Sequence, residues 1–186
     1  MQFEFSTVSR IIFGSGELSS IGELASAFGK RILIISGVPS EIEDRLSNLL
    51  SMEELSNSFL IIKAEPTVDI IRNLLDIARV TIPDLVIGIG GGSAIDTAKA
   101  IASLLNNPGD ITDYLEVIGS NVPIRNSSLP LIAIPTTSGT GAEVTKNAVI
   151  SSPTHHIKVS LRSSFLLPRI ALVDPELTLN LPPLIT

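Results

Sequence analysis

The sequence predicts an α/β fold, a Rossmann-like parallel sheet with helices on both of its faces. Short runs of aliphatic residues, bounded by glycine and proline, alternate with segments whose apolar residues recur at helical spacing. The expected strands are apolar at nearly every position, which is typical of parallel strands that are covered on both faces. The length of 186 residues fits one domain, or one domain and a fragment of another.

The first half of the chain predicts an edge segment, two strands and three helices. In each helix the apolar residues return every three or four positions, as Leu18 and Ile21 do in the first, which Gly29 ends. Thr67 is a typical N-cap residue for the third helix. The elements expected in this half are an edge segment at 10–13, a helix at 17–28, a strand at 32–35, a helix at 41–52, a strand at 59–62 and a helix from Thr67 to Pro83.

The second half predicts three more strands and one long helix. The strands are the apolar runs at 85–89, 131–134 and 170–173, and the helix spans 93–105. Two polar segments separate these elements. Residues 106–126 are rich in Pro, Gly and Asn and indicate a surface excursion with a turn at 110–115, and residues 151–162 indicate a hairpin or loop.

The composition excludes several classes of protein. Lys and Arg number 13 against 19 Asp and Glu, so the net charge is −6 and nucleic acid is not an expected partner. The chain has no cysteine, which excludes disulfides, thiolate metal sites and a thiol nucleophile. No apolar run approaches the length of a membrane span and the N-terminus has no basic leader, so we expect a cytoplasmic protein with no membrane contact. Charged residues make up only 17%, which fits a domain that hides one face.

The first segment that could carry chemistry is the glycine-rich turn from Gly88 to Ser93. It follows a strand and opens a helix, so its backbone N–H groups could bind an anion such as a pyrophosphate. A tight turn that only permits close packing is the alternative, because the segment is neither a GxGxxG fingerprint nor a P-loop. Asp96 has two interpretations as well. Its carboxylate could form a capping box with Ser93 or contact a ligand, and Lys99 could simply pair with it.

A second candidate segment, Pro135 to Glu143, contains four hydroxyl side chains and two glycines. It also follows an apolar strand, and loops at the carboxyl ends of parallel strands are where α/β folds bind ligands. The alternative is a Ser/Thr turn that satisfies its own backbone. His155 and His156 are adjacent in a polar segment and predict a solvated pair rather than a metal site. The sequence leaves the role of Lys158 open.

Three segments in register resemble the iron-containing (group III) alcohol dehydrogenases. They are Val86–Ala100, Ile134–Thr145 and Ala171–Thr178. The resemblance extends from about Phe13 to Thr186. It implies a dinucleotide-binding domain like the N-terminal domain of dehydroquinate synthase at residues 1–181, with residues 182–186 as the start of an all-helical metal-binding domain that is missing from the chain.

The resemblance also implies roles for individual residues. Gly91, Gly92 and Ser93 would hold the pyrophosphate, and Asp96 would hydrogen-bond near the nicotinamide ribose. Lys158 would face the same ribose. Asp174 is expected to be structural. The residues expected along the adenosine and phosphate path are Thr136, Thr137 and Thr140.

Two departures from the family pattern shape the functional prediction. The family's ligands for a divalent metal, Fe or Zn, lie beyond the end of this chain, so no residue here inherits a metal role and the chain alone should lack normal activity. The family often has an aspartate after the first parallel strand that excludes a 2′-phosphate. Here Gly37 stands in that segment, so we count it among the cofactor-binding residues and expect NADP to be accepted at least as well as NAD.

The resulting hypothesis is the cofactor-binding portion of an NAD(P)-dependent and metal-dependent alcohol dehydrogenase. Its partners would be a small alcohol or aldehyde, the missing helical domain and, because an apolar face would be left exposed, further copies of itself. One alternative is a nucleotide-binding module without activity of its own. Another is a related enzyme of the glycerol dehydrogenase or maleylacetate reductase type.

Overall fold

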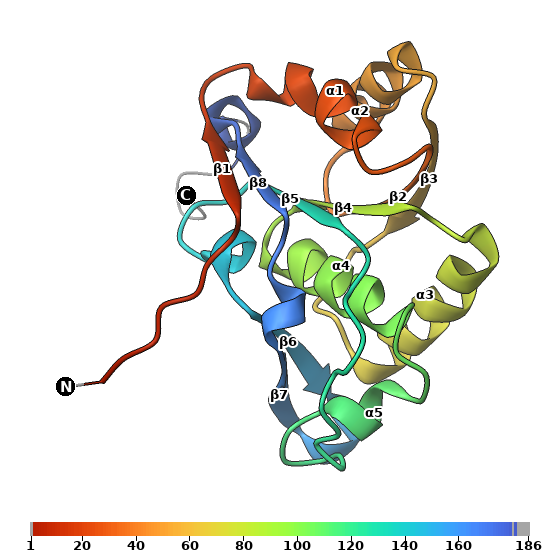
Figure 1. The fold of residues 1–186 in the computed structure, drawn as a ribbon, viewed down its shortest axis with the longest axis vertical. Coiled ribbons are helices and arrows are strands. Elements are labelled where there is room, and N and C mark those ends of the chain that lie inside the picture. The colour runs from red at the N-terminus through yellow and green to blue at the C-terminus, as the bar shows by residue number, and fades with distance from the viewer. Residues whose placement is uncertain (1, 180, 182–186) are drawn as a thin grey trace.

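A six-stranded sheet forms the centre of the computed structural model, which describes residues 2–179 and 181. Its strand order is β1-β8-β5-β4-β2-β3, and every pairing is parallel, as predicted (Figure 1). The predicted end of the domain and the residues 182–186 that follow it fall at or beyond the last described residue. The strands are β1 (Arg10–Phe13), β2 (Arg31–Ser36), β3 (Ser56–Ile61), β4 (Leu85–Gly90), β5 (Leu131–Pro135) and β8 (Ile170–Val173).

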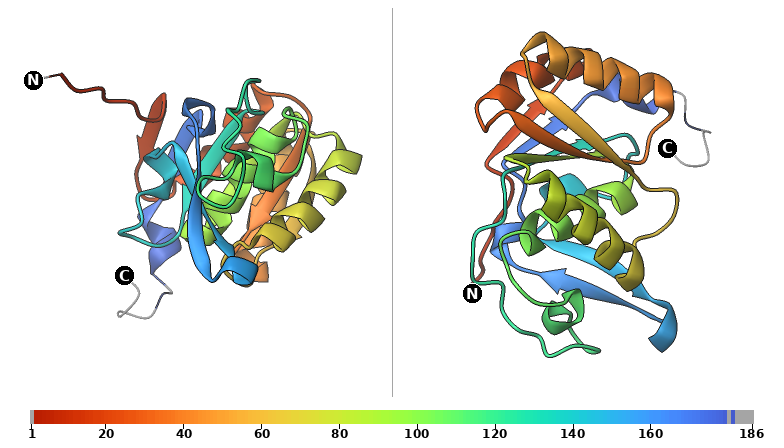
Figure 2. Two further views of the ribbon diagram at one scale, coloured as in Figure 1. Left: turned by 90° about the horizontal axis from the view of Figure 1, so that it is seen from below. Right: turned by 90° about the vertical axis from the view of Figure 1, so that its right-hand side faces the viewer.

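Helices cover both faces of the sheet, which confirms the predicted layers (Figure 2). The helices α1 (Ile21–Ser26) and α2 (Ser40–Met52) pack on one face, and α3 (Val68–Thr81) and α4 (Gly92–Leu104) pack on the other. The strands supply both cores. In β2, for example, Ile32 and Ile34 join the core beneath α1 and α2, whereas Leu33 and Ile35 join the opposite core, because successive side chains of a strand point to opposite faces.

The helix starts and stops follow local chemistry. Thr67 caps α3, since its Oγ1 accepts a hydrogen bond from the Ile70 N–H at 3.2 Å. The helix expected at 17–28 differs from the prediction. It begins with a 3-10 turn at Glu17–Ser20, and the α-helical part ends at Ser26. In the part of the chain that is described, no helix combines the length and apolar character needed to cross a bilayer.

The polar segment predicted as a hairpin or loop is a hairpin. Strand β6 (Asn147–Ser152) pairs antiparallel with β7 (Ile157–Arg162), so the hairpin begins earlier than expected. Its buried residues alternate along each strand, with Ala148 and Ile150 on β6 matched by Val159 and Leu161 on β7.

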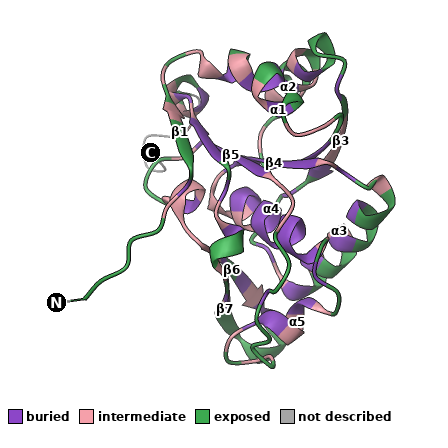
Figure 3. Cartoon of the chain, in the orientation of Figure 1, coloured by how far each residue is buried: buried purple, intermediate pink, exposed green. Residues whose placement is uncertain are grey.

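Helix α4 lies between the sheet and this hairpin and is buried along most of its length (Figure 3). Small residues allow the sheet to approach it closely. A Cβ added to Gly88 would lie 2.7 Å from the Cβ of Ala98, so only glycine fits at this point of β4. The N-terminus of α4 is thereby fixed against the carboxyl ends of the central strands.

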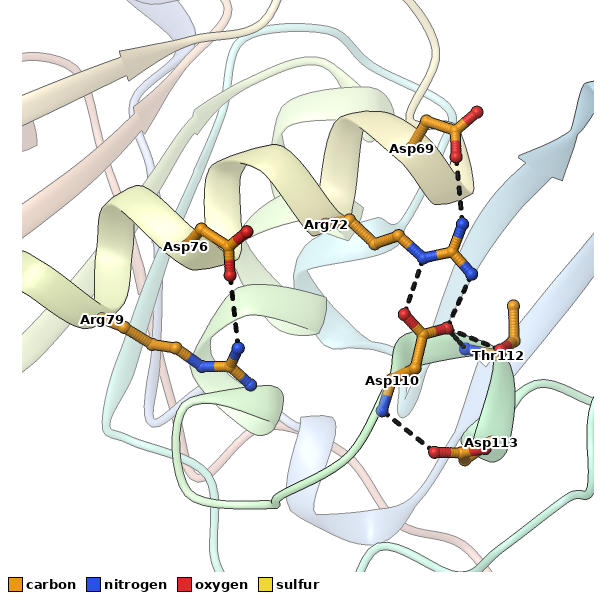
Figure 4. Close-up of polar contacts among 7 residues, drawn as sticks. All are labelled: Asp69, Arg72, Asp76, Arg79, Asp110, Thr112 and Asp113. Atoms are coloured by element: carbon orange, nitrogen blue, oxygen red, sulfur yellow. Dashed lines mark hydrogen bonds and ion pairs between the residues drawn. The ribbon is translucent and has the colours of Figure 1, made fainter.

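An ion pair links the excursion between α4 and β5 to α3, in addition to their packing in one core (Figure 4). Asp110 caps the short helix α5 (Ile111–Tyr114) through the Thr112 N–H, and Asp113 reaches back to the Asp110 N–H. The Asp110 carboxylate also accepts two hydrogen bonds from the guanidinium of Arg72, at 2.6 and 2.8 Å. This bidentate ion pair is exposed to solvent and holds the excursion in place.

Candidate functional site

Loops after β2, β4 and β5 meet at the carboxyl edge of the sheet. The Gly37 N–H donates to the Ile89 carbonyl at 2.9 Å, and the Thr136 N–H donates to the Gly90 carbonyl at 3.0 Å. A Cβ added to Gly90, whose φ is +140°, would lie 3.1 Å from the Cα of Gly37. Glycine is therefore needed at Gly90 for both backbone conformation and space.

The glycine-rich turn and the threonine-rich loop, which the sequence singled out separately, lie against each other. A Cβ on Gly91 would lie 3.4 Å from Thr137 Oγ1, and one on Gly92 would lie 3.4 Å from Thr140 Cγ2. The half-buried backbone at Gly91 and Gly92 is thus flanked by hydroxyl side chains. Thr136 is buried behind them, with 6% of its surface exposed.

The N-terminus of α4 presents free donors in this segment. The Gly91 carbonyl accepts the N–H groups of Ala94 and Ile95, at 3.1 and 3.2 Å. The N–H groups of Gly92 and Ser93 belong to the first turn, where a helix has no internal acceptor for them. Together with the positive end of the helix dipole, they favour an anion at this position.

The capping-box interpretation of Asp96 is wrong. Gly91 is the N-cap residue, because its extended backbone starts the helix two residues earlier than Ser93. Ser93 therefore lies inside the first turn. The Asp96 carboxylate points to the hairpin instead, where Oδ2 accepts the Val149 N–H at 3.0 Å.

A cavity of about 130 Å³ separates the start of α4 from the hairpin. It brings together three residues that the sequence predicted, Ser93, Asp96 and Lys158. The remaining residues around this cavity are Glu65, Pro66, Val149 and Ser151.

Glu65 is a residue of this cavity that sequence reasoning missed. Its Oε1 accepts a hydrogen bond from Lys158 Nζ at 2.6 Å, and its Oε2 accepts one from the Ser151 hydroxyl at 3.3 Å. The hydrogen bond from Lys158 lowers the pKa of Glu65. A signal was present in the sequence, because Glu65 follows a predicted strand and precedes the Thr67 cap, which places it at the carboxyl edge of the sheet.

Two further cavities continue along the same edge. One of about 280 Å³ is bordered by Gly37, Lys63, Glu65, Gly91 and Ser93, among others. The other, of about 360 Å³, lies beyond the threonine-rich loop, and Thr137 is one of its lining residues. The first two cavities share Glu65 and Ser93, and Thr137 of the third lies beside Gly91 of the second.

Asp96 and Lys99 carry the unusual electrostatics of the site. The Asp96 side chain is 14% exposed, and burial raises its pKa, although the Val149 N–H and the Lys99 ammonium oppose that rise. Lys99 is completely buried, and burial lowers its pKa. Its Nζ lies 3.6 Å from Asp96 Oδ1 and donates to Thr145 Oγ1 and the Asn147 carbonyl, both at 2.9 Å. The sequence indicated the pairing with Asp96 but not the burial.

The remaining candidate residues have structural contacts. His155 Nδ1 lies 2.8 Å from the Ser152 hydroxyl, in the turn of the hairpin. The buried Asp174 carboxylate accepts the N–H groups of Gly16, Leu18 and Glu176 at 3.0–3.1 Å, which fits its expected structural role. Across residues 2–179 and 181, no cluster of three or more His, Asp or Glu side chains could hold a metal ion. A divalent metal therefore does not fit the part of the chain described.

Comparison with known proteins points to one family. Residues 8–175 match the family described as "Iron-containing alcohol dehydrogenase". The chain is 37% identical over 191 aligned residues to the long-chain-alcohol dehydrogenase 1 of Geobacillus thermodenitrificans, with 97% of this chain and 48% of that protein covered. It is 34% identical to the sulfoacetaldehyde reductase of Bilophila wadsworthia, over all of this chain and 48% of the other.

Solved structures show the same relation. The NADH-dependent butanol dehydrogenase A of Thermotoga maritima superimposes with a TM-score of 0.90 at 28% identity, over 100% of this chain and 47% of that one. The sulfoacetaldehyde reductase of Bifidobacterium kashiwanohense, solved in complex with NAD+, gives a TM-score of 0.85 at 30% identity, over 100% and 49%. The chain spans about half the length of the relatives it matches.

Proposed function

Since the chain belongs to the iron-containing alcohol dehydrogenase family, we propose that the carboxyl edge of its sheet binds NAD(P). The observation that carries this proposal is the meeting of the glycine-rich turn, the threonine-rich loop and the hairpin around the N-terminus of α4. The two cavities that share Ser93 at the start of α4 support a ligand that extends to both sides of this helix end. The protein would serve as the cofactor-binding portion of an alcohol dehydrogenase that interconverts small alcohols and aldehydes.

Each part of the site fits one part of the cofactor. The free N–H groups of Gly92 and Ser93 would donate to the pyrophosphate, and the hydroxyls of Thr137 and Thr140 would flank it. Asp96, which lines the cavity beside the hairpin, would accept a hydrogen bond from a ribose hydroxyl. When bound, the nicotinamide supplies the position that gives or takes the hydride.

Lys158 and Glu65 would control access to the same cavity. The Lys158 ammonium donates to Glu65 Oε1 at 2.6 Å. Both side chains are more than half exposed, so the bond can exchange with solvent and with a ligand. Lys158 would then turn its ammonium to the nicotinamide ribose.

We propose that NADP is accepted at least as well as NAD. Gly37 brings no carboxylate to the end of β2, and Lys63 lines the same cavity as Gly37. The carboxylate found nearby, Glu43 on α2, accepts a hydrogen bond from the Ser36 hydroxyl at 2.5 Å. Parallel titrations with NADPH and NADH test this point. A tenfold preference for NADH, about 1.4 kcal/mol, would contradict it and would indicate that Glu43 takes the part of the absent aspartate.

Alcohol turnover needs a group that polarises the alcohol oxygen, and a divalent metal supplies this in metal-dependent enzymes. The described residues offer no ligand set for such an ion, so we assign cofactor binding alone to them. Cofactor binding without alcohol oxidation in the presence of Fe²⁺ or Zn²⁺ is the expected behaviour of the 186-residue chain.

The decisive experiment is a fluorescence titration of the chain with NADH and NADPH. We expect micromolar binding that Asp96→Ala weakens about tenfold, since a charge-assisted hydrogen bond to the ribose is lost. Asp76→Ala is the matched control, because Asp76 is an exposed aspartate on α3 with only an ion pair to Arg79. Binding that is absent in the unmodified chain, or equally affected by both substitutions, contradicts the proposed site.

A further inference from the structure

Among the described residues, Lys99 has the largest side chain that is fully buried. A buried lysine is costly unless its charge is compensated, because desolvation disfavours the ammonium. Its ammonium has two hydrogen-bond acceptors and one ion-pair partner. They are the Thr145 hydroxyl and the Asn147 carbonyl, both at 2.9 Å, and Asp96 Oδ1 at 3.6 Å. This arrangement suits a charged ammonium rather than a neutral amine.

The partners of Lys99 belong to the proposed site. Thr145 and Asn147 connect the threonine-rich loop to β6, so Lys99 attaches α4 to both. The Asp96 carboxylate is therefore held from two sides, by Lys99 within α4 and by the Val149 N–H from β6.

On the basis of the proposed function, we propose that Lys99 is a positioning residue for cofactor binding that acts through Asp96. Its ammonium keeps the buried Asp96 carboxylate ionised and directed into the cavity between α4 and the hairpin. A protonated Asp96 would lose acceptor strength, and it could not serve Val149 and a ribose hydroxyl equally well.

Other charged groups near this pair also affect whether Lys99 and Asp96 are ionised. Glu143, from the 3-10 helix Ala142–Val144, favours the charged form of Lys99. Glu65 and Lys158 face Asp96 across the cavity and are paired with each other at 2.6 Å. Of the two lysines, Lys158 is exposed and paired with Glu65, whereas Lys99 is fully buried and lies 3.6 Å from Asp96.

The test compares Lys99→Met, which keeps much of the side-chain volume without the charge, with the unmodified chain. We expect NADH binding to weaken about tenfold at pH 7, and its loss on acidification to begin about one pH unit higher. Lys99→Met in an Asp96→Asn background should bind NADH no more weakly than Asp96→Asn alone. Additive losses in the double variant, or an unchanged pH profile in folded Lys99→Met, overturn the proposal.

A ligand-free measurement keeps this test separate from the proposed function. Carbon NMR of the 13C-labelled chain, with Asp96 assigned by its absence from the Asp96→Asn spectrum, reports the ionisation of the Asp96 carboxyl. We expect an ionised carboxyl at pH 7 in the unmodified chain and an upward shift of its pKa in Lys99→Met. A protonated Asp96 at pH 7 in the unmodified chain overturns the proposal even if Lys99→Met fails to fold. Failure of the unmodified chain to bind either dinucleotide, with this titration as expected, contradicts the proposed function alone.

Discussion

Two ion pairs on neighbouring helices of the same layer differ in a way that distance alone does not reveal. Arg72 on α3 donates two hydrogen bonds of 2.6 and 2.8 Å to Asp110 (Figure 4). The Arg72 side chain is 43% exposed and the Asp110 side chain 40%. Lys99 and Asp96 on α4 lie 3.6 Å apart, and their exposed fractions are only 0% and 14%. The pair with the better geometry lies in water, and the looser pair lies in the interior.

The two aspartates respond in opposite directions to these surroundings. The hydrogen bonds from Arg72 lower the pKa of Asp110, because they stabilise its charged form by more than partial burial disfavours it. Burial raises the pKa of Asp96 in spite of a neighbouring cation. An exposed pair therefore fixes a surface segment at small energetic cost, whereas a buried pair holds its members in an environment that favours neutral forms.

The largest predicted effect is on stability when the buried pair is broken. Lys99→Met leaves the Asp96 charge uncompensated in the interior and removes a donor from Thr145 and Asn147. We expect the free energy of unfolding to fall by about 3–5 kcal/mol. Urea unfolding measures this change, and Asp96→Asn in the same background should restore part of the loss. If Lys99→Met lowers the free energy of unfolding by less than Arg72→Gln does, burial does not make the Lys99–Asp96 pair the more important one for stability.

Acidification should change the stability cost of breaking each pair, and the two costs should change over different ranges of pH. In Lys99→Met the folded pKa of Asp96 is raised further above its ordinary value of about 4, so folding binds a proton and is favoured at low pH. Its stability deficit should narrow as the pH falls from neutral toward 4, by about 1.4 kcal/mol for each unit of pKa shift. Unfolding curves between pH 4 and pH 8 test this, and a deficit that stays constant over that range contradicts it.

The exposed pair should respond weakly and only in acid. Asp110 has a lowered folded pKa, so its contribution is complete above the unfolded value of about 4 and is lost progressively as the pH falls from there to the folded pKa. Arg72→Gln should cost about 0.5–1 kcal/mol at pH 7, since both side chains are partly solvated. The same urea series, extended to pH 3, should show this difference begin to shrink. A difference that grows as the pH falls from 5 to 3 would exclude Asp110 as its source.

The sequence predicted the parts of this comparison that depend on local pattern. The six strands, the Thr67 cap and the turn that opens α4 follow from apolar runs, a hydroxyl side chain and consecutive glycines. The meeting of the glycine-rich turn with the threonine-rich loop could also be anticipated, because both follow neighbouring parallel strands.

The parts that failed depend on contacts between distant segments. The partner of Asp96 lies 53 residues along the chain, on a strand whose register local sequence does not fix. The burial of Lys99 had no such local signal, because Asp96, Lys99 and Ser103 share one side of α4, and a polar side of a helix normally faces solvent. The sequence did not show that the hairpin covers this side.

The smallest predicted effect concerns a third pair, Glu65 and Lys158, which combines a short contact of 2.6 Å with exposed side chains at the site itself. Glu65→Gln should leave the urea midpoint unchanged, because solvent screens the pair. It should tighten NADH binding about threefold at low salt, since an anion is removed beside a cavity that takes a dianionic ligand and Lys158 is released, and the gain should shrink as ionic strength rises. Glu54→Gln, a change of the same kind far from the cavities, is the control. Weaker NADH binding by Glu65→Gln would mean instead that Glu65 itself accepts a hydrogen bond from the cofactor. Glu65 would then be a cofactor-binding residue like Asp96, and not a member of a surface ion pair like Asp110.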